Sequence, residues 1–266
     1  MTRKLALVTG ASAGIGAAFA RLLAAKGYDL ALTARRADRL DALAGELRDA
    51  HGVTVLTRAA DLADPASPTA ILDHIAGQGR AIDALINNAG YGLPGGYGET
   101  DWADQARFIQ VMVTAPCELA HRVLPGMQQR GFGRIVNVAS LAGLIPGAPG
   151  ATLYGASKAF LVKFSQSLHV EAARDGVHVS ALCPGMTYSE FHDVNGTRDR
   201  MRAVIPGWMW QDAATVAAAG YVALEANRAI CVPGLPNKLA AAFAKAIPDS
   251  WALALIARRA PVRTPQ

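Results

Sequence analysis

The sequence predicts a single α/β domain over residues 1–266, built on a doubly wound parallel sheet of about seven strands with helices on both faces. Two observations lead to this prediction. Short runs of almost entirely apolar residues alternate with helix-length segments, as expected of strands that are covered on both faces. No linker rich in Pro, Gly or Ser divides the chain, and its length suffices for one large core.

Seven apolar runs are the expected strands, and the segments between them are the expected helices. The strands are predicted at 4–8, 29–33, 53–57, 81–86, 134–139, 177–182 and 229–232. Helices are predicted at 14–27, 37–52, about 101–129 and about 152–174. Two further segments with apolar faces, 238–247 and 250–259, predict a helical C-terminal extension over 236–266.

The composition argues against several function classes. The net charge of +5 is mild and no basic stripe is interleaved with aromatic residues, so nucleic-acid binding is not expected. The three cysteines, Cys117, Cys183 and Cys231, lack metal-ligand spacing and cannot all pair, so we expect no metal and free thiols in a reducing compartment. Without a secretory signal or a run of roughly 18 apolar residues, a cytoplasmic protein is expected.

Nearly every unusual residue lies in a turn that follows a predicted strand. These turns read TGASAGIG, ARR, DLAD, NNAGYG, SLAGL and PGMTYSEF. In doubly wound sheets the ligand binds outside the carboxyl ends of the strands. We therefore expect one functional site at that edge of the sheet.

The first of these turns has the spacing Gly-x-x-x-Gly-x-Gly and opens a helix. Glycines allow a tight turn, and the free N–H groups and the dipole of a helix start attract a diphosphate. The turn is therefore interpreted as a phosphate-binding loop. The alternative is a glycine-rich turn that only lets the helix pack on the sheet.

Tyr154 and Lys158 stand four residues apart at the head of a predicted helix, which places both side chains on one face. A nearby ammonium favours the phenolate and so lowers the pKa of the tyrosine. The pair could then serve as a general acid/base near neutral pH. The alternative is that both are ordinary residues of a helix surface.

These motifs occur together in an order that points to one family. TGASAGIG at 9–16, Asp61, NNAG at 87–90, Ser140, YGASK at 154–158 and CPG at 183–185 together resemble the short-chain dehydrogenase/reductase family over about residues 4–191. The resemblance implies a Rossmann-type fold and an oxidoreductase that interconverts a ketone or aldehyde and an alcohol with a nicotinamide cofactor. It also implies a cofactor-binding and catalytic core over 1–188 and a substrate loop over 189–211.

The resemblance implies a role for each site residue. Tyr154 would be the general acid/base, Ser140 would hold the carbonyl oxygen, and Lys158 would bind the nicotinamide ribose and lower the Tyr154 pKa. Ser140 could instead be an ordinary cap at a strand end, and Asp61 would bind the adenine amino group. The implied cofactor contacts are Gly10, Ser12, Ala13, Gly14, Ile15, Gly16, Arg35, Arg36, Asp61, Leu62, Asn88, Ala89, Gly90, Tyr154, Lys158, Pro184, Gly185 and Thr187.

The end of the second predicted strand bears on the choice of cofactor. An acidic residue there would bind the adenosine ribose hydroxyls and select NAD(H), but the sequence has Ala34. Arg35 and Arg36 follow at once, and guanidinium groups suit a 2′-phosphate. NADP(H) is therefore favoured over NAD(H). The alternative is two solvated arginines at a helix start.

The sequence departs from the family at Met112, where related proteins usually carry an asparagine that bends the helix and helps to hold a water near the lysine. A thioether is a very weak hydrogen-bond acceptor and no donor. One interpretation is an active enzyme whose water is held by a backbone carbonyl. The alternative is a nucleotide-binding regulatory protein with impaired catalysis. A shift of register would bring Gln110 or Thr114 to this place instead.

The expected partner is a small, hydrophobic carbonyl or alcohol substrate. Trp208, Met209 and Trp210 would line an apolar pocket with Leu141, Ile145 and Leu153, unless the tryptophans only pack beneath the next helix. The resemblance implies a homodimer or homotetramer that uses the helices at about 101–129 and 152–174. The C-terminal extension is expected to pack over the domain or against another subunit, with membrane contact as the weaker alternative.

Overall fold

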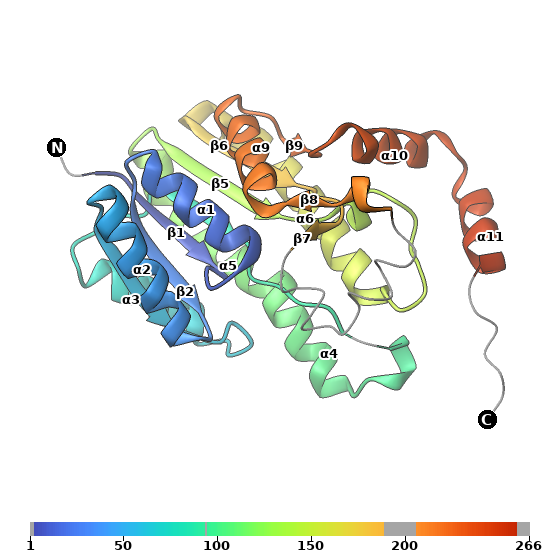
Figure 1. Cartoon of the computed structure of the whole chain (residues 1–266), viewed down its shortest axis with the longest axis horizontal. Coiled ribbons are helices and arrows are strands. Elements are labelled where there is room, and N and C mark those ends of the chain that lie inside the picture. The colour runs from blue at the N-terminus through green and yellow to red at the C-terminus, as the bar shows by residue number, and fades with distance from the viewer. Residues whose placement is uncertain (1–2, 94, 189–205, 260–266) are drawn as a thin grey trace.

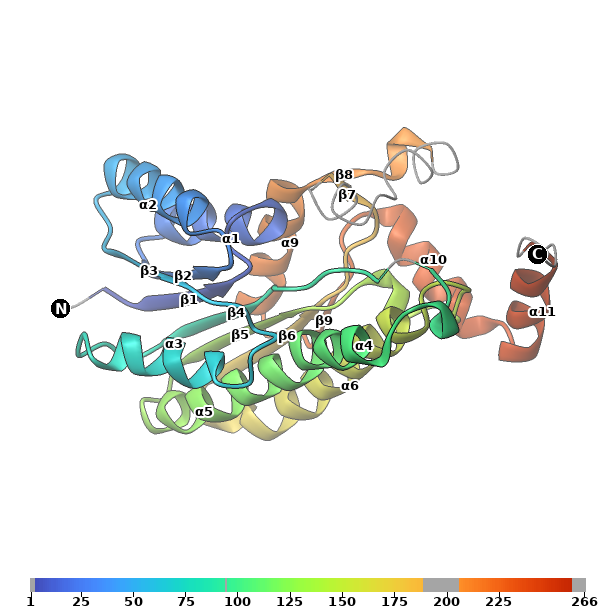
Figure 2. The same ribbon diagram turned by 90° about the horizontal axis from the view of Figure 1, so that it is seen from below.

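The protein folds around one parallel sheet, as Figures 1 and 2 show for the computed structural model of the chain. The structure describes residues 3–93, 95–188 and 206–259. Within these ranges seven parallel strands pair in the order β3-β2-β1-β4-β5-β6-β9. The order reverses between β1 and β4, which confirms the predicted doubly wound fold class.

Each strand lies where an apolar run predicted it, with shifted ends. The sheet consists of β1 (Leu5–Thr9), β2 (Asp29–Ala34), β3 (Val55–Ala59), β4 (Ala84–Asn87), β5 (Gly133–Val138), β6 (Val177–Leu182) and β9 (Ile230–Cys231). β1 is buried at every position because helices cover both of its faces, whereas the edge strand β3 is buried only at its first residue. Two short strands that were not predicted, β7 (Thr187–Tyr188) and β8 (Gln211–Asp212), pair separately.

Helices cover both faces of the sheet (Figure 2). One face carries α1 (Gly14–Ala25), α2 (Ala37–His51) and α9 (Ala213–Glu225), and the other carries α3 (Ser67–Ala76), α4 (Trp102–Ile109), α5 (Ala115–Gln129) and α6 (Thr152–Ala172). Each face has its own large apolar cluster. Phe19 and Leu40 belong to the first cluster, and Phe108 and Leu119 belong to the second. Burial of apolar surface on both faces drives the formation of this layered fold.

The helix that was expected to run through α4 and α5 is interrupted. Between them the chain forms a π-helical turn, η2 (Gln110–Thr114), in which the N–H of Ala115 donates to the carbonyl of Gln110. Pro116 follows and has no N–H, so the carbonyl of Met112 cannot receive its usual α-helical hydrogen bond. The local sequence therefore favours the wider turn, and that turn falls at Met112.

The segment after β5 lies against the start of α6. It contains the short 3₁₀ helix η3 (Leu141–Gly143), whose last residue packs directly on the α6 backbone. A Cβ added at Gly143 would lie 2.5 Å from the carbonyl carbon of Lys158 and 2.7 Å from the amide nitrogen of Ala159. Only glycine allows this approach, which brings the end of β5 beside the first turns of α6.

The C-terminal extension is helical and leads away from the sheet (Figure 1). It consists of α10 (Leu235–Ala246) and α11 (Asp249–Arg259). Asn237 near the start of α10 is buried, and its Nδ2 donates to the carbonyl of Pro233 and to Gln211 Oε1. A Cβ added at Gly185 would lie 2.4 Å from Asn237 Oδ1, so the extension packs on the turn after β6. In the described part of the chain, no helix has the length and apolar character to cross a membrane.

We predict that Gly143→Ala lowers the free energy of unfolding by about 1–3 kcal/mol, because the added methyl group clashes with the α6 backbone. Gly147→Ala is the matched control in the same segment, since a Cβ there meets no atom within 4 Å. The control should change stability by less than about 0.5 kcal/mol. Urea unfolding followed by circular dichroism measures both variants, and equal stabilities would contradict the described packing.

Candidate active site

Three polar side chains from two neighbouring elements meet at the carboxyl edge of the sheet. Ser140 comes directly after the end of β5, and Tyr154 and Lys158 lie in the first turns of α6. The close contact of Gly143 with the α6 backbone brings the two elements together. The three residues that were predicted from the sequence to be catalytic are therefore neighbours in the fold.

Ser140 contacts both its own turn and the tyrosine. Its Oγ accepts a hydrogen bond from the N–H of Ala142 at 3.1 Å, which caps η3. Its side chain also forms a hydrogen bond with the side chain of Tyr154. Ser140 therefore caps the turn at the strand end and also interacts with the side chain of Tyr154.

Lys158 is buried, with 5% of its surface exposed, and its Nζ donates to the carbonyl of Val138 at 2.8 Å. Nζ lies 5.7 Å from the centroid of the Tyr154 ring, which confirms that the two side chains share one helix face. Burial disfavours the charged ammonium and lowers the pKa of Lys158 to about 8.

The pKa of Tyr154 is raised in this structure. Burial of the hydroxyl disfavours the phenolate, and this effect outweighs the opposing hydrogen bond with Ser140. The expectation that Lys158 lowers the tyrosine pKa is therefore wrong for this structure, because desolvation is the larger influence. The hydroxyl keeps its proton at neutral pH and is able to donate it.

The glycine-rich turn lies between the ends of β1 and β4. Gly10 and Gly14 have φ angles of 64° and 55°, in the region that favours glycine. A Cβ added at Gly16 would lie 2.3 Å from the carbonyl oxygen of Gly10, so packing alone already requires a glycine there. The side-chain amide of Asn88 secures the turn by donating to the carbonyls of Thr9 and Gly10, at 3.0 and 3.2 Å.

The start of α1 is suited to an anion as well. Its N-cap residue, Ala13, makes no side-chain hydrogen bond to the first turn, and that turn carries no acidic residue. Ser12, Gly14 and Ile15 are partly exposed at this end of the helix. Backbone N–H groups without a side-chain cap, together with the helix dipole, fit the diphosphate of a dinucleotide.

Arg36 reaches the glycine-rich turn from the end of β2. Its Nη2 donates to Ser12 Oγ at 3.0 Å, while Arg35 is exposed beside it. Ala34 ends β2, so the strand tip offers no carboxylate to ribose hydroxyls. A guanidinium at this place fits a phosphate on the adenosine ribose.

Asp61 and Leu62 follow β3 at the same edge. The Asp61 carboxylate accepts a hydrogen bond from the N–H of Ala63 at 3.0 Å and lies 3.4 Å from Arg107 Nη2. It is partly exposed, whereas Leu62 is buried in the apolar cluster of its face. The carboxylate is therefore held in place and accessible, as recognition of an adenine amino group requires.

Asn88, Ala89 and Gly90 extend from the end of β4. The hydroxyl of Thr9 accepts hydrogen bonds from the N–H groups of Asn88 and Ala89, at 2.9 and 3.0 Å. These bonds join the ends of β1 and β4, where the strand order reverses. Gly90 therefore lies at the point of the sheet where doubly wound folds bind their ligands.

Met112 and Lys158 both lie next to Gly90. A Cβ added at Gly90 would lie 2.9 Å from Met112 Sδ and 3.8 Å from Lys158 Nζ, so the thioether and the ammonium flank the same glycine. Thr114, which a shifted register would have brought here, is exposed. A cavity of about 250 Å³ adjoins Met112 and is lined by Thr9, Leu62, Asn87, Ala89, Val111, Met112, Pro116, Val138 and Leu161.

Pro184, Gly185 and Thr187 follow β6 and complete this edge of the sheet. The N–H of Leu141 donates to the carbonyl of Pro184 at 2.9 Å, which joins this turn to the turn that holds Ser140. Thr187 is buried, and its hydroxyl donates to the carbonyl of Gly185 at 3.2 Å. The structure thus places Pro184 next to the Ser140 turn and joins Thr187 to Gly185 within the segment that follows β6.

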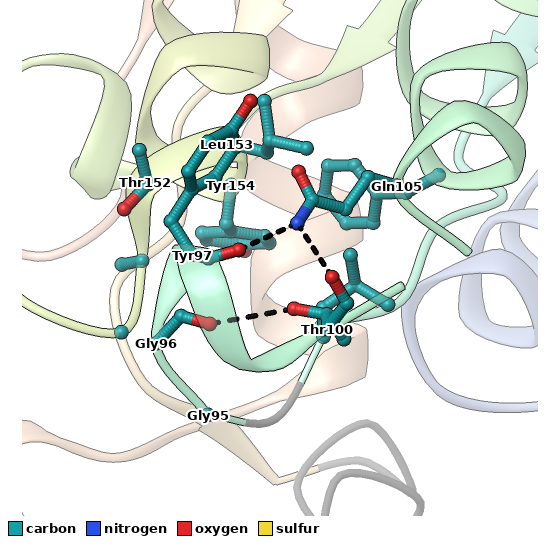
Figure 3. A pocket seen from close by; sticks show the side chains of 12 residues that line it. Gly95, Gly96, Tyr97, Thr100, Gln105, Thr152, Leu153 and Tyr154 are labelled. Carbon is teal, nitrogen blue, oxygen red and sulfur yellow. Dashed lines mark hydrogen bonds between the residues drawn. The ribbon is translucent and has the colours of Figure 1, made fainter. Parts of the chain in front are cut away.

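A pocket of about 310 Å³ lies beside Tyr154 (Figure 3). It is lined by Leu93, Gly95, Gly96, Tyr97, Thr100, Gln105, Phe108, Gly150, Ala151, Thr152, Leu153 and Tyr154. Leu153 was expected in the substrate pocket, but Tyr97, Gln105 and Phe108 were not. Gln105 offered a signal, because this polar residue stands three positions before Phe108 on the buried face of α4.

The aromatic residues that were expected to line the pocket have other surroundings. Trp210 is buried and stacks on Tyr188 with ring centroids 5.1 Å apart, whereas Trp208 is exposed. Most of the expected substrate loop, 189–205, lies outside the described residues. In the described ranges no group of three or more His, Cys, Asp or Glu side chains is arranged to hold a metal ion.

Comparison with known proteins identifies the family of this chain. The family model for short chain dehydrogenase matches residues 4–199. Sulfoacetaldehyde reductase 2 of Chromohalobacter salexigens is 38% identical over 189 residues, which are 70% of this chain and 74% of that protein.

Solved structures are similar over most or all of the chain. A short-chain dehydrogenase from Sphingobium yanoikuyae in complex with NADPH is 35% identical, with a TM-score of 0.80 and 99% and 98% of the two chains covered. A bulky-bulky ketone specific alcohol dehydrogenase from Comamonas testosteroni is 30% identical (TM-score 0.75; 100% and 97% covered). A short-chain dehydrogenase/reductase from Burkholderia phymatum in complex with NAD is 28% identical (TM-score 0.77; 86% and 88% covered). This chain therefore belongs to the short-chain dehydrogenase family and is an oxidoreductase that interconverts CH–OH and C=O groups with a nicotinamide dinucleotide.

Proposed function

We propose that this enzyme interconverts a hydrophobic ketone or aldehyde and its alcohol with NADP(H), and that Ser140, Tyr154 and Lys158 carry the reaction. The observation that supports this most directly is the hydrogen bond between the Ser140 and Tyr154 side chains, beside the buried Lys158. A carbonyl oxygen placed at these two hydroxyls would receive both a hydrogen bond and a proton.

Tyr154 is the general acid of the reduction in this proposal, and the bound nicotinamide supplies the hydride. Because burial raises the pKa of Tyr154, its hydroxyl retains the proton near neutral pH and donates it as negative charge develops on the carbonyl oxygen. Alcohol oxidation needs the phenolate instead. The oxidation rate should therefore increase as the pH rises through the alkaline range.

Ser140 and Lys158 position the reacting groups. The Ser140 hydroxyl holds the carbonyl oxygen in line with Tyr154, and this orientation contributes to the rate because it is set before the reaction. An ammonium has three N–H donors, and Lys158 uses one for the carbonyl of Val138. The remaining donors would bind the ribose hydroxyls of the nicotinamide half.

The residues around the glycine-rich turn favour NADP(H). Arg36 lies within hydrogen-bonding distance of Ser12 and so places a cation beside the phosphate-binding turn, while Ala34 stands where an NAD-selecting carboxylate would be needed. The relative from Sphingobium yanoikuyae was solved in complex with NADPH and that from Burkholderia phymatum in complex with NAD, so the relatives alone do not decide between the dinucleotides. The preference of this chain therefore rests on its own arginines.

The π-helical turn bears on the alternative, a regulatory protein that binds the dinucleotide without turnover. In the family an asparagine bends this helix, and in this chain a π-helical turn that contains Met112 interrupts it. Pro116 has no N–H, so the carbonyl of Met112 lacks its α-helical donor, and in this proposal that backbone oxygen would hold the water in place of the asparagine. We therefore favour an active enzyme.

The walls of the pocket beside Tyr154 favour a substrate with apolar surface. The lining includes the apolar or aromatic side chains of Leu93, Tyr97, Phe108 and Leu153. The similar Comamonas testosteroni enzyme is specific for bulky-bulky ketones. We also propose a cytoplasmic homodimer or homotetramer, for which the exposed side chains of Phe160 and Val170 on α6 offer apolar contact area.

We predict that the wild-type protein oxidises NADPH in the presence of at least one compound from a panel of small aldehydes, aryl ketones, steroids and fatty acyl ketones. Tyr154→Phe should abolish this turnover while NADPH still binds, because only the proton donor is lost. Absorbance at the NADPH band measures turnover, and fluorescence titration measures binding. A folded protein that binds NADPH and turns over no compound would support the regulatory alternative.

We predict that Arg36→Ala raises the Kd for NADPH about 10- to 100-fold, because a charge-assisted hydrogen bond to the 2′-phosphate is lost. The Kd for NADH should stay unchanged. Arg35→Ala tests the second guanidinium in the same way. Arg174→Ala is the charge-matched control, since Arg174 is exposed before β6 at the opposite edge of the sheet. A wild-type preference for NADH would contradict this assignment.

We predict that Met112→Asn keeps or raises kcat, since the amide adds hydrogen-bonding groups beside Lys158. NADPH affinity should remain the same, because Met112 flanks Gly90 from the core side of the site. Steady-state kinetics and circular dichroism together give the answer. A variant that is folded, binds NADPH and is inactive would show that Met112 does not occupy the position that asparagine has in the family.

A further inference from the structure

Gln105 is a polar side chain on the buried face of α4, which it shares with Phe108. Only 3% of its surface is exposed, and its Nε2 donates to the carbonyls of Tyr97 and Thr100, at 2.7 and 3.2 Å. Both partners are acceptors, so the amide can be oriented only with its nitrogen toward them. This orientation directs Oε1 away from the Tyr97–Thr100 turn.

The other polar atom of this amide, Oε1, is a hydrogen-bond acceptor. Among the described residues no donor reaches Gln105 Oε1, although the atom is buried. Buried acceptors nearly always have a partner, and one that lacks it within the protein points to a ligand or a water. Figure 3 shows the oxygen on the side of the amide that faces Leu153 in the pocket beside Tyr154.

The surroundings of this oxygen limit what can bind it. The pocket walls near it are mostly apolar, with Leu93, Phe108 and Leu153 among them, and Tyr154 lines the same pocket. A ligand group that binds this oxygen must have an N–H or O–H donor, because an amide oxygen only accepts hydrogen bonds. A carboxylate would meet an acceptor inside an apolar pocket and be disfavoured.

We propose that Gln105 Oε1 accepts a hydrogen bond from the substrate, so that the enzyme selects carbonyl compounds that carry a neutral donor, a hydroxyl or an amide N–H, on the part remote from the reacting carbonyl. This inference rests on the proposed function and specifies its substrate class. Gln105 is then a specificity residue, and its Nε2 holds it in position through the Tyr97–Thr100 turn.

The test compares acetophenones that carry hydroxymethyl, ethyl or methoxymethyl at the 3′ or 4′ position. Hydroxymethyl and ethyl have nearly the same size, and methoxymethyl keeps the oxygen but has no donor. With wild-type protein and saturating NADPH, kcat/KM for the hydroxymethyl compound should exceed that of both others about 10-fold or more at one of the two positions. Equal values for all three compounds at both positions would overturn the proposal.

Gln105→Met supplies the second comparison, because methionine has a similar length but is no hydrogen-bond donor and only a weak acceptor. The preference for hydroxymethyl should fall to about one in this variant. A merely structural role of Gln105 would lower kcat/KM for all compounds alike and leave their ratio unchanged, and that result would overturn the proposal. Where the variant does not fold, the comparison on the wild-type protein decides alone.

Binding separates this inference from the proposed function. If no carbonyl compound is reduced, the proposed function fails, and the Gln105 contact is then tested by thermal unfolding with NADPH and each of the three compounds. A rise in Tm that is specific to hydroxymethyl and absent in Gln105→Met supports the contact. Equal shifts in Tm, or no shifts, mean that the oxygen binds only water, and they overturn it.

Discussion

The hydrogen bond from Lys158 Nζ to the carbonyl of Val138 links α6 to the end of β5, and the site is arranged around this link. A buried amine is costly to the fold unless its donors are satisfied, so Lys158 holds the helix at one position relative to the sheet. Gly143 closes the same junction from the side of Ser140. Gly90, after β4, lies next to the lysine and to Met112 of the π-helical turn. The relative positions of Ser140 and Tyr154 follow from these contacts.

Much of the fold and several site residues could be predicted because they are local properties of the sequence. Apolar runs mark the strands, and the spacing of Tyr154 and Lys158 on a helix determines that they share a face. The pKa of Tyr154 could not be obtained in this way, since its burial depends on packing between distant segments. Asn237 was missed for the same reason, because its partner Gln211 belongs to a distant segment. The partners of Gln105, Tyr97 and Thr100, are near in sequence, but its place in the pocket depends on segments that the fold brings together.

The ends of the elements were less predictable than their existence. β3 begins and ends two residues later than expected. It includes Arg58, beyond the predicted end at Thr57, because an edge strand can carry polar residues that face water. The interruption at η2 also escaped the periodicity, although Pro116 was visible in the sequence. A proline early in a helix favours a π-helical turn but is also compatible with a new helix start, so Pro116 alone did not predict the interruption.

The contact between Asn237 and Gly185 limits how this chain and its relatives could exchange parts. The first turn of α10 lies so close to the turn after β6 that any side chain at position 185 would occupy the place of the Asn237 amide. A chimera that receives this C-terminal extension therefore needs glycine at that position, however well the rest of its sheet matches. The extension and the carboxyl edge of β6 are thus a matched pair that must change together during evolution or design.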